Sequence, residues 1–277
     1  MDVERLKAIA DCGAAHGMLV SAVSNAYWAE TKDRALDVLQ YLGSIHMLAI
    51  SCDAYHQQAI PFERVRNAIS AAEKLDLPFN IAVCTENEED PAYLLIISRL
   101  REIVEADKIN TAVVFPAGRA LEQICEFRHE LVDEPPRSAC AAGSSPIVFP
   151  DGKVIACIGP VIDLPTHHPL VLGNLRKDSL EVILDRAETN AILHAIRVWG
   201  PRKLISILHE SNRHAPLPEK YVKDSVCCAC YSLMTEPTTV AFLEQLAADV
   251  LFQRKIAYAR VFYLQESRMA EILGLAS

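Results

Sequence analysis

The fold is decided by three successive stretches, Ile45-His-Met-Leu-Ala-Ile-Ser51, Pro61-Phe-Glu-Arg-Val-Arg-Asn-Ala-Ile69 and Phe79-Asn-Ile-Ala-Val-Cys84. The first and the third are short apolar runs typical of buried strands. The second places apolar residues three and four positions apart, as in a helix that opens at a proline. A strand, a helix and another strand in this order make up the unit of a parallel sheet. The sequence therefore predicts an α/β fold around these residues.

The same alternation extends to both sides of these stretches. Residues 18–23 and 111–115 are predicted strands, and residues 31–42 and 91–106 are predicted helices. Four nearly apolar strands with helical connections predict a parallel sheet covered by helices, a partial (β/α) barrel of about four strands over residues 1–120.

Ligands of such folds bind at the edge of the sheet where the parallel strands end. This edge would carry Ser24-Asn25, Ser51 to His56, Cys84-Thr85 and Pro116 to Arg119. No Gly-rich phosphate loop follows any strand, so the sequence does not predict a Rossmann nucleotide site or a P-loop.

The second half of the chain contains a pattern typical of metal ligands. Nine cysteines without a secretion signal are a poor disulfide framework, and five of the nine fall within residues 140–230. Residues 146–157 form a predicted β-hairpin that turns at Pro150-Asp151-Gly152, which brings Cys140 close to Cys157. Cys227 and Cys230 form a Cys-x2-Cys pair, so the sequence predicts four thiolates in two pairs, as in zinc and iron–sulfur sites. The competing interpretation is a set of buried cysteines without a ligand, as expected for Cys52, Cys84 and Cys125.

The remaining elements are helical. Helices are predicted over residues 179–198 and 202–209, and residues 237–277 form a helical tail. The apolar faces of this tail, including Tyr258, Phe262 and Met269, are interpreted as core or as a helix–helix contact. His167 and His168, which lie between two prolines, are interpreted as a surface loop.

Composition excludes several classes of protein. Hydrophobic residues make up 51% of the 277 residues, and the formal net charge is −9. A chain with this charge and without a basic patch is not expected to bind nucleic acid. No apolar run approaches the roughly 18 residues that span a bilayer, and the first dozen residues are too charged for a signal peptide. We therefore expect a cytoplasmic protein without a membrane segment.

Several of these stretches resemble radical S-adenosylmethionine (radical SAM) enzymes. The fourth strand and following helix of that family are similar to Leu48-Ala-Ile-Ser-Cys-Asp-Ala-Tyr-His56 and the helix from Pro61. Its third strand is similar to residues 17–25, and the turn that leaves its sixth strand is similar to Pro116-Ala-Gly-Arg-Ala120. Cys140, Gly152, Cys157, Leu172-Gly-Asn-Leu175 and the pair Cys227 and Cys230 resemble the SPASM iron–sulfur domain appended to many of these enzymes, in its shortened twitch form. The resemblance runs from about residue 5 to 233, and it implies a small α+β SPASM-like domain over residues 121–236.

Two motifs of that family are absent from the sequence. The Cys-x3-Cys-x2-Cys loop, which in the family holds the cluster that cleaves S-adenosylmethionine, does not occur, and neither does the Gly-Gly-Glu that binds the cofactor's amino group. The predicted strands match the third to the sixth of a six-strand barrel, as if the chain began after both motifs. We therefore expect no cleavage of S-adenosylmethionine by this chain alone. The strand at residues 18–23 would be a bare edge, which we expect the N-terminal helix, a second copy or a partner chain to cover.

The resemblance implies roles for individual residues. Cys140, Cys157, Cys227 and Cys230 would hold one auxiliary 4Fe–4S cluster, with Cys228 as a spare thiol or as a substitute for Cys227, and zinc as the alternative metal. Ser51 and Asp53 match positions near the ribose of S-adenosylmethionine; the alternative is that Asp53 caps the next turn. In function the chain resembles peptide- and protein-modifying maturases, with a peptide or protein as substrate. The alternatives are a fragment of an intact enzyme, a non-catalytic subunit that binds a peptide or a partner, and a zinc-stapled structural module.

Overall fold

The computed structural model describes residues 2–118, 120, 122, 124, 126–211 and 216–274. Its internal contacts divide the chain into two compact units, Met1–Val114 (unit 1) and Phe115–Ser277 (unit 2), and each unit has its own buried core. The sequence placed a boundary near residue 120 and set residues 237–277 apart as a tail. In the structure Phe242, Leu243, Phe252 and Ile256 of that segment lie in the core of unit 2.

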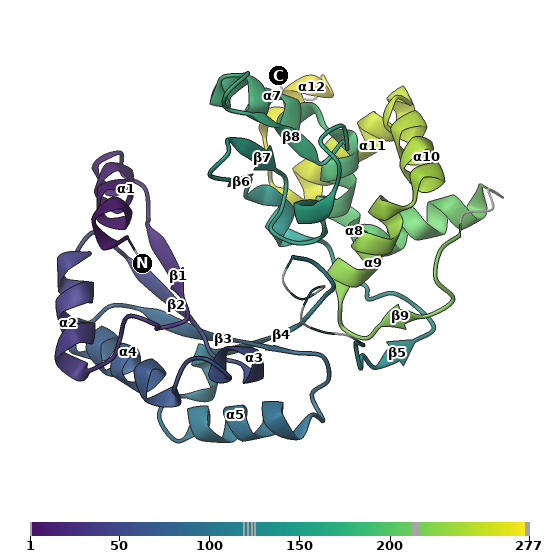
Figure 1. Cartoon of the computed structure of the whole chain (residues 1–277). Coiled ribbons are helices and arrows are strands. Elements are labelled where there is room, and N and C mark those ends of the chain that lie inside the picture. Colours follow the sequence, from purple (N-terminus) through teal and green to yellow (C-terminus); the bar gives the residue numbers. More distant parts are fainter. Residues whose placement is uncertain are drawn as a thin grey trace. The chain divides into compact units, whose positions relative to one another are not determined.

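Unit 1 is built on a sheet of four parallel strands, which confirms the predicted parallel α/β arrangement (Figure 1). The strands stand in sequence order, β1 (Ser21–Ser24), β2 (Met47–Ser51), β3 (Phe79–Thr85) and β4 (Ile109–Val113). The fourth strand starts two residues earlier than the sequence predicted. Because the strands are parallel and adjacent, all four end at the same edge of the sheet.

Helices α2 (Lys32–Tyr41), α4 (Phe62–Lys74) and α5 (Pro91–Arg101) connect these strands at the positions that the apolar spacing predicted. The other elements of unit 1 are α1 (Val3–Ala15), which precedes the sheet, the short helix α3 (Ala54–Gln57), which lies where the sequence predicted a polar loop, and the 3₁₀ turn η1 (Ala106–Lys108). Side chains cap three of the connections, since Thr31, Asp53 and Asp90 each accept a hydrogen bond from a backbone N–H in the first turn of the next helix. The helix predicted over residues 91–106 is shorter, because α5 ends at Arg101 and residues 102–105 form a turn before η1.

Within unit 1 helices cover one face of the sheet. Helices α2, α4 and α5 lie along one face (Figure 1). Side chains on that face, such as Leu48 and Ile81, are buried, whereas alternate residues such as Ser51 and Cys84 are only half-buried. The reason is that the other face carries small or polar side chains, which offer little apolar surface for a second layer. On β1 the Val23 side chain is 74% exposed, and no further strand pairs with β1 among the described residues.

Unit 2 combines short strands with helices. Strands β6 (Ile147–Val148) and β7 (Lys153–Ile155) form the predicted antiparallel hairpin, to which β8 (Val171–Asn174) adds a third strand. Gly152 turns the hairpin with a φ of +87°, and a Cβ there would stand 2.9 Å from Asn174 Oδ1. The other elements are β5 (Leu131–Val132) paired with β9 (Tyr221–Val222), the 3₁₀ turns η2 (Ala141–Ser144) and η3 (Pro160–Asp163), and helices α7 (Leu180–Thr189), α8 (Ala191–Glu210), α9 (Val226–Thr235), α10 (Pro237–Ala247), α11 (Val250–Leu264) and α12 (Arg268–Ile272).

The helices predicted over residues 179–198 and 202–209 are divided differently in the structure. The first predicted helix breaks at Asn190, whose side chain accepts a hydrogen bond from the backbone N–H of Leu193 and so starts α8. Helix α8 then continues through a kink at Gly200, where φ is 75°. A Cβ at Gly200 would stand 1.8 Å from the carbonyl oxygen of Ser138, so only glycine fits this kink.

Among the described helices, none is long and apolar enough to cross a membrane by itself. Helices α9 and α10 are long and apolar enough only when they are taken together, and the chain bends by 92° between them.

Candidate functional site

Unit 2 gathers the four cysteines that the sequence singled out as two pairs. Cys157 follows the end of β7, and Cys140 precedes η2, where its backbone N–H donates a hydrogen bond to the carbonyl of Ile196. Cys227 and Cys230 lie one turn apart on α9, so their side chains share a face of that helix. A Cβ on Gly159 would stand 3.6 Å from the sulfur of Cys227 and 3.7 Å from that of Cys157, and the absence of one leaves space beside both.

Electrostatic interactions connect every pair among these four thiols. The pKa of Cys227 is raised to about 11 by burial and by the neighbouring thiols, among them Cys140 and Cys157. Burial raises the pKa of Cys230 still more strongly, and the same three thiols add to the effect. The pKa of Cys157 is raised by burial, while backbone hydrogen bonds from Gly159 and Val161 oppose the shift by stabilising its thiolate. A shared cation would relieve the cost that burial places on the charged forms of Cys157, Cys227 and Cys230.

Cys228 is set apart from this group. Its pKa is raised by burial, and the opposing influence comes from a hydrogen bond with Ser225, the residue that caps α9. On α9, Cys228 is one residue from Cys227 and two from Cys230, so it lies on a different side of the helix from that pair. The choice between Cys227 and Cys228 as a ligand stays a prediction.

The four thiols lie in the same part of unit 2, but they do not converge on a single point. Across the described part of the chain, no three His, Cys, Asp or Glu side chains are close enough to hold a single metal ion.

The local setting of the second pair differs from the sequence-based expectation. We expected Cys227 and Cys230 in a loop, whereas they occupy the first turns of α9. The helix begins here because Ser225 accepts a hydrogen bond from the backbone N–H of Cys228 at 3.2 Å. The serine two residues before the pair was a readable cap signal.

In unit 1 the edge where the strands end carries Ser51 and Asp53. Ser51 is the last residue of β2 and is half-buried on the open face of the sheet. Asp53 is 2% exposed, and its Oδ1 accepts from the backbone N–H of His56 at 3.0 Å and lies 2.9 Å from His56 Nδ1. Asp53 thus caps α3, as the structural alternative expected, and its carboxylate is occupied by His56.

A second contact closes the same edge beside Asp53. Tyr55 donates a hydrogen bond from its hydroxyl to Glu86 Oε1 at 2.8 Å, which joins the segments that follow β2 and β3. Burial and this hydrogen bond raise the pKa of Tyr55, so the phenol is held in its neutral form. Of the other residues expected at this edge, Arg119 lies outside the described residues, as does Cys125 elsewhere in the chain.

Two interpretations of surface and core residues are wrong. His168 was expected in a surface loop but is 5% exposed, and its Nδ1 accepts from the backbone N–H of Leu170. Burial lowers its pKa to about 4. Tyr258 and Phe262 were interpreted as core or as a helix–helix contact but are 59% and 67% exposed, whereas Met269 is buried. Periodicity finds a helix face of this kind without showing whether another element covers it.

Comparison with known proteins adds one finding. No model of a known protein family matches the chain. Over 252 residues, which are 87% of this chain and 76% of the relative, the chain is 22% identical to YydG of Bacillus subtilis (strain 168), a protein whose name assigns it provisionally to peptide biosynthesis. The chain is therefore similar, along most of its length, to a protein named for the making of a peptide.

Proposed function

We propose that the chain is an iron–sulfur protein of the radical SAM maturase type that acts in peptide biosynthesis. One 4Fe–4S cluster would be held in unit 2 by Cys140, Cys157, Cys227 and Cys230. The gathering of these four thiols, each interacting with the other three, carries the proposal. The similarity to YydG supports the choice of a peptide as the molecule acted on.

The residues around the thiols fit such a group. Four sulfur donors suit iron–sulfur clusters and zinc alike, and the resemblance to SPASM domains favours iron. The backbone hydrogen bonds to Cys157 would persist on a bound thiolate, where such donors tune the potential of a cluster. Gly159 leaves the space beside Cys157 and Cys227 free of a side chain.

The residues of the site have separate roles. Cys140 lies just before η2, Cys157 follows β7, and Cys227 and Cys230 lie in the first turns of α9, which Ser225 caps. When bound, the cluster would supply an electron acceptor or a point of attachment for a peptide. Since the sequence has no Cys-x3-Cys-x2-Cys, we propose that this chain alone does not cleave S-adenosylmethionine, although Ser51 remains on the open face of the sheet in unit 1.

The test is the metal content of the protein purified without oxygen. We expect about four irons and four acid-labile sulfides per chain, with a broad brown absorbance. Cys230→Ser should lose most of the iron. Cys228→Ser is a matched control two residues away on the same helix. It should retain the iron, because Cys228 lies on a different side of α9 from Cys227 and Cys230. One zinc per chain and no colour would contradict the proposal and leave a structural staple.

A further inference from the structure

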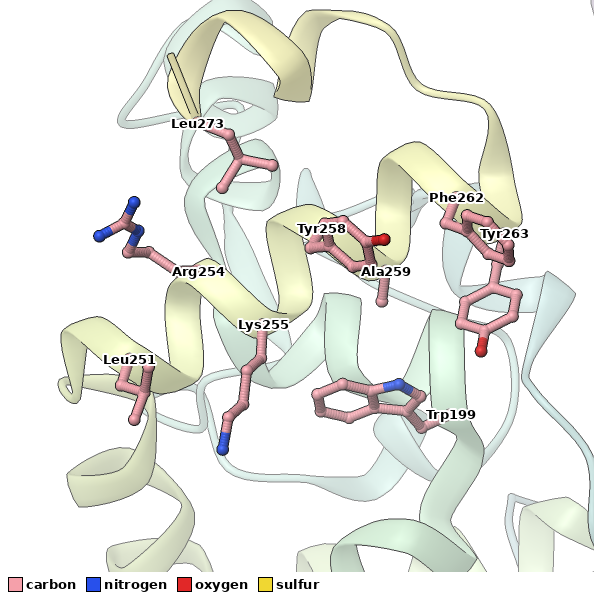
Figure 2. A pocket seen from close by; sticks show the side chains of 9 residues that line it. All are labelled: Trp199, Leu251, Arg254, Lys255, Tyr258, Ala259, Phe262, Tyr263 and Leu273. Carbon is pink, nitrogen blue, oxygen red and sulfur yellow. The ribbon is translucent and has the colours of Figure 1, made fainter. Parts of the chain in front are cut away.

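Helix α11 forms one wall of a groove of about 610 Å³ in unit 2. Figure 2 shows Leu251, Arg254, Lys255, Tyr258 and Phe262 along this helix, with Trp199 of α8 opposite them. The stretch from Leu251 to Phe262 corresponds to about 16 Å of helix at 1.5 Å per residue. The remaining lining residues are Ala259, Tyr263 and Leu273.

The apolar part of this groove is exposed and consists mainly of aromatic side chains. Tyr258, Phe262 and Tyr263 are each more than half exposed. The Tyr258 and Phe262 rings lie nearly parallel with centroids 6.3 Å apart, and Tyr263 meets Phe262 edge to face at 5.2 Å. A contiguous patch of this kind is uncommon on a monomer and marks a binding surface.

The floor of the groove is held in place. The Trp199 ring packs edge to face on the buried Phe252 at 5.9 Å, and the kink at Gly200 follows it directly. On the opposite side of α11, the buried Arg260 donates hydrogen bonds to Glu188 Oε1 and to Glu266 Oε2. A rigid aromatic surface loses little conformational entropy when it binds a partner.

Two cations stand at one end of this surface. Arg254 and Lys255 are exposed, and within the described ranges neither has an ion pair, although the chain as a whole carries a net charge of −9. Arg, Trp and Tyr are the side chains that dominate the binding energy of interfaces. A second copy of the chain, packed by twofold symmetry on this face, would bring the same cations toward each other. Charge therefore favours an acidic partner.

We propose that this groove binds a peptide segment that inserts apolar side chains between Trp199 and the rings of α11 and places acidic side chains against Arg254 and Lys255. The choice of a peptide, rather than another acidic partner, rests on the proposed function in peptide biosynthesis. The groove shares no lining residue with the four cysteines, so peptide binding and cluster binding are separable.

Trp199 provides a direct probe of occupancy. The chain has two tryptophans, and Trp28→Phe leaves the groove residue as the only one. Three synthetic peptides of about ten residues are titrated into this variant: one of Glu with Leu and Phe, one with Lys in place of Glu, and one of Glu with Ser. We expect the first to shift the Trp199 emission with a Kd below about 100 µM, and the other two to bind at least about tenfold more weakly. Added salt should weaken the first.

Charge reversal identifies the site. In the same background Arg254→Glu/Lys255→Glu should weaken the acidic peptide about tenfold and strengthen the basic one. The control Lys177→Glu/Lys220→Glu changes the net charge equally, at exposed residues outside the groove, and should change the Kd by less than about twofold.

Three results would overturn the proposal: no peptide binding at about 1 mM, equal binding of acidic and basic peptides, or an acidic peptide that binds the reversed variant as tightly as the parent. An emission shift that follows protein concentration or anionic phosphatidylglycerol vesicles, with no response to the peptides, would assign the face to a second copy or to a membrane instead. Iron and sulfide measured on the same samples keep the two proposals apart. Loss of peptide binding with iron present refutes the groove alone, and binding without iron refutes the cluster alone.

Discussion

Arg260 is the residue whose loss should most clearly weaken unit 2. It is 4% exposed on α11, and its guanidinium donates to Glu188 Oε1 at 2.6 Å, to the carbonyl of Glu188 at 3.2 Å and to Glu266 Oε2. Arg197 of α8 also donates to Glu266, at 2.6 Å, so the network ties α11 to α8 and to the segment before α12. The substitution that tests this network is Arg260→Leu, which keeps apolar volume and removes the charge.

The expected cost follows from the partners left behind. Hydrogen bonds to charged groups contribute about 1.5–3 kcal/mol each, and breaking a buried pair costs about 3–5 kcal/mol. The Glu188 and Glu266 side chains are 34% and 27% exposed, so water replaces part of what they lose, and Arg197 remains with Glu266. We therefore expect Arg260→Leu to lower the free energy of unfolding of unit 2 by about 3 kcal/mol.

Urea unfolding followed by Trp199 fluorescence measures this loss in the Trp28→Phe background. Arg254→Leu is the matched control, since it makes the same replacement at an exposed residue of the same helix, and it should stay within about 0.5 kcal/mol of the parent. Arg260→Lys should fall between the two, because it keeps the charge without the forked geometry. If Arg260→Leu costs less than about 1 kcal/mol, or no more than Arg254→Leu, the network does not stabilise the unit.

Three further predictions concern acid sensitivity, backbone geometry and capping. The pKa of His194 is lowered to about 4 by burial and by nearby arginines, against an ordinary value of 6.5 in the unfolded chain. The stability that neutral His194 contributes is therefore complete above pH 6.5 and is lost as the pH falls toward 4, on the order of 2 kcal/mol. Urea unfolding at pH 7 and pH 5 should show this loss of unfolding free energy, and His194→Gln should make the loss smaller. Gly200→Ala forces a Cβ toward Ser138 O and strains φ, so thermal unfolding should show a loss of more than about 2 kcal/mol, and an unchanged Tm would refute the close approach. Asp53→Ala removes the cap of α3 and the partner of His56 and should cost unit 1 about 1 kcal/mol by urea unfolding, whereas Asp53→Asn should cost less.

The sequence predicted the parts of the fold that local pattern controls. Apolar runs and helical spacing predicted the four parallel strands and helices α2, α4 and α5, and Pro150-Asp151-Gly152 predicted the hairpin. The break at Asn190 was missed because the apolar positions continue through it, while the decision is made by one capping side chain.

For the candidate site, the sequence predicted Cys140, Cys157, Cys227 and Cys230 as ligands and left Cys228 as a substitute for Cys227; this ligand set stays a prediction. The choice between Cys227 and Cys228 depends on the direction of side chains on α9, and it requires knowing that α9 begins at Val226. The groove was not predicted at all, because it needs Trp199 and Phe262, which are far apart in sequence, to face the same space. Whether a stripe of aromatic residues is core or surface is decided by tertiary packing, which periodicity does not report.

Among the residues that the structure describes, the two cores have no buried residue in common, since that of unit 1 ends at Leu100 and that of unit 2 begins at Val154. Cooperativity in unfolding comes from shared buried contacts, so the chain should melt in two transitions rather than one. A single melting temperature for the whole protein would then be an average without a defined meaning. Each unit contains one tryptophan, Trp28 in unit 1 and Trp199 in unit 2. The two transitions can therefore be followed separately by fluorescence when the other tryptophan is substituted.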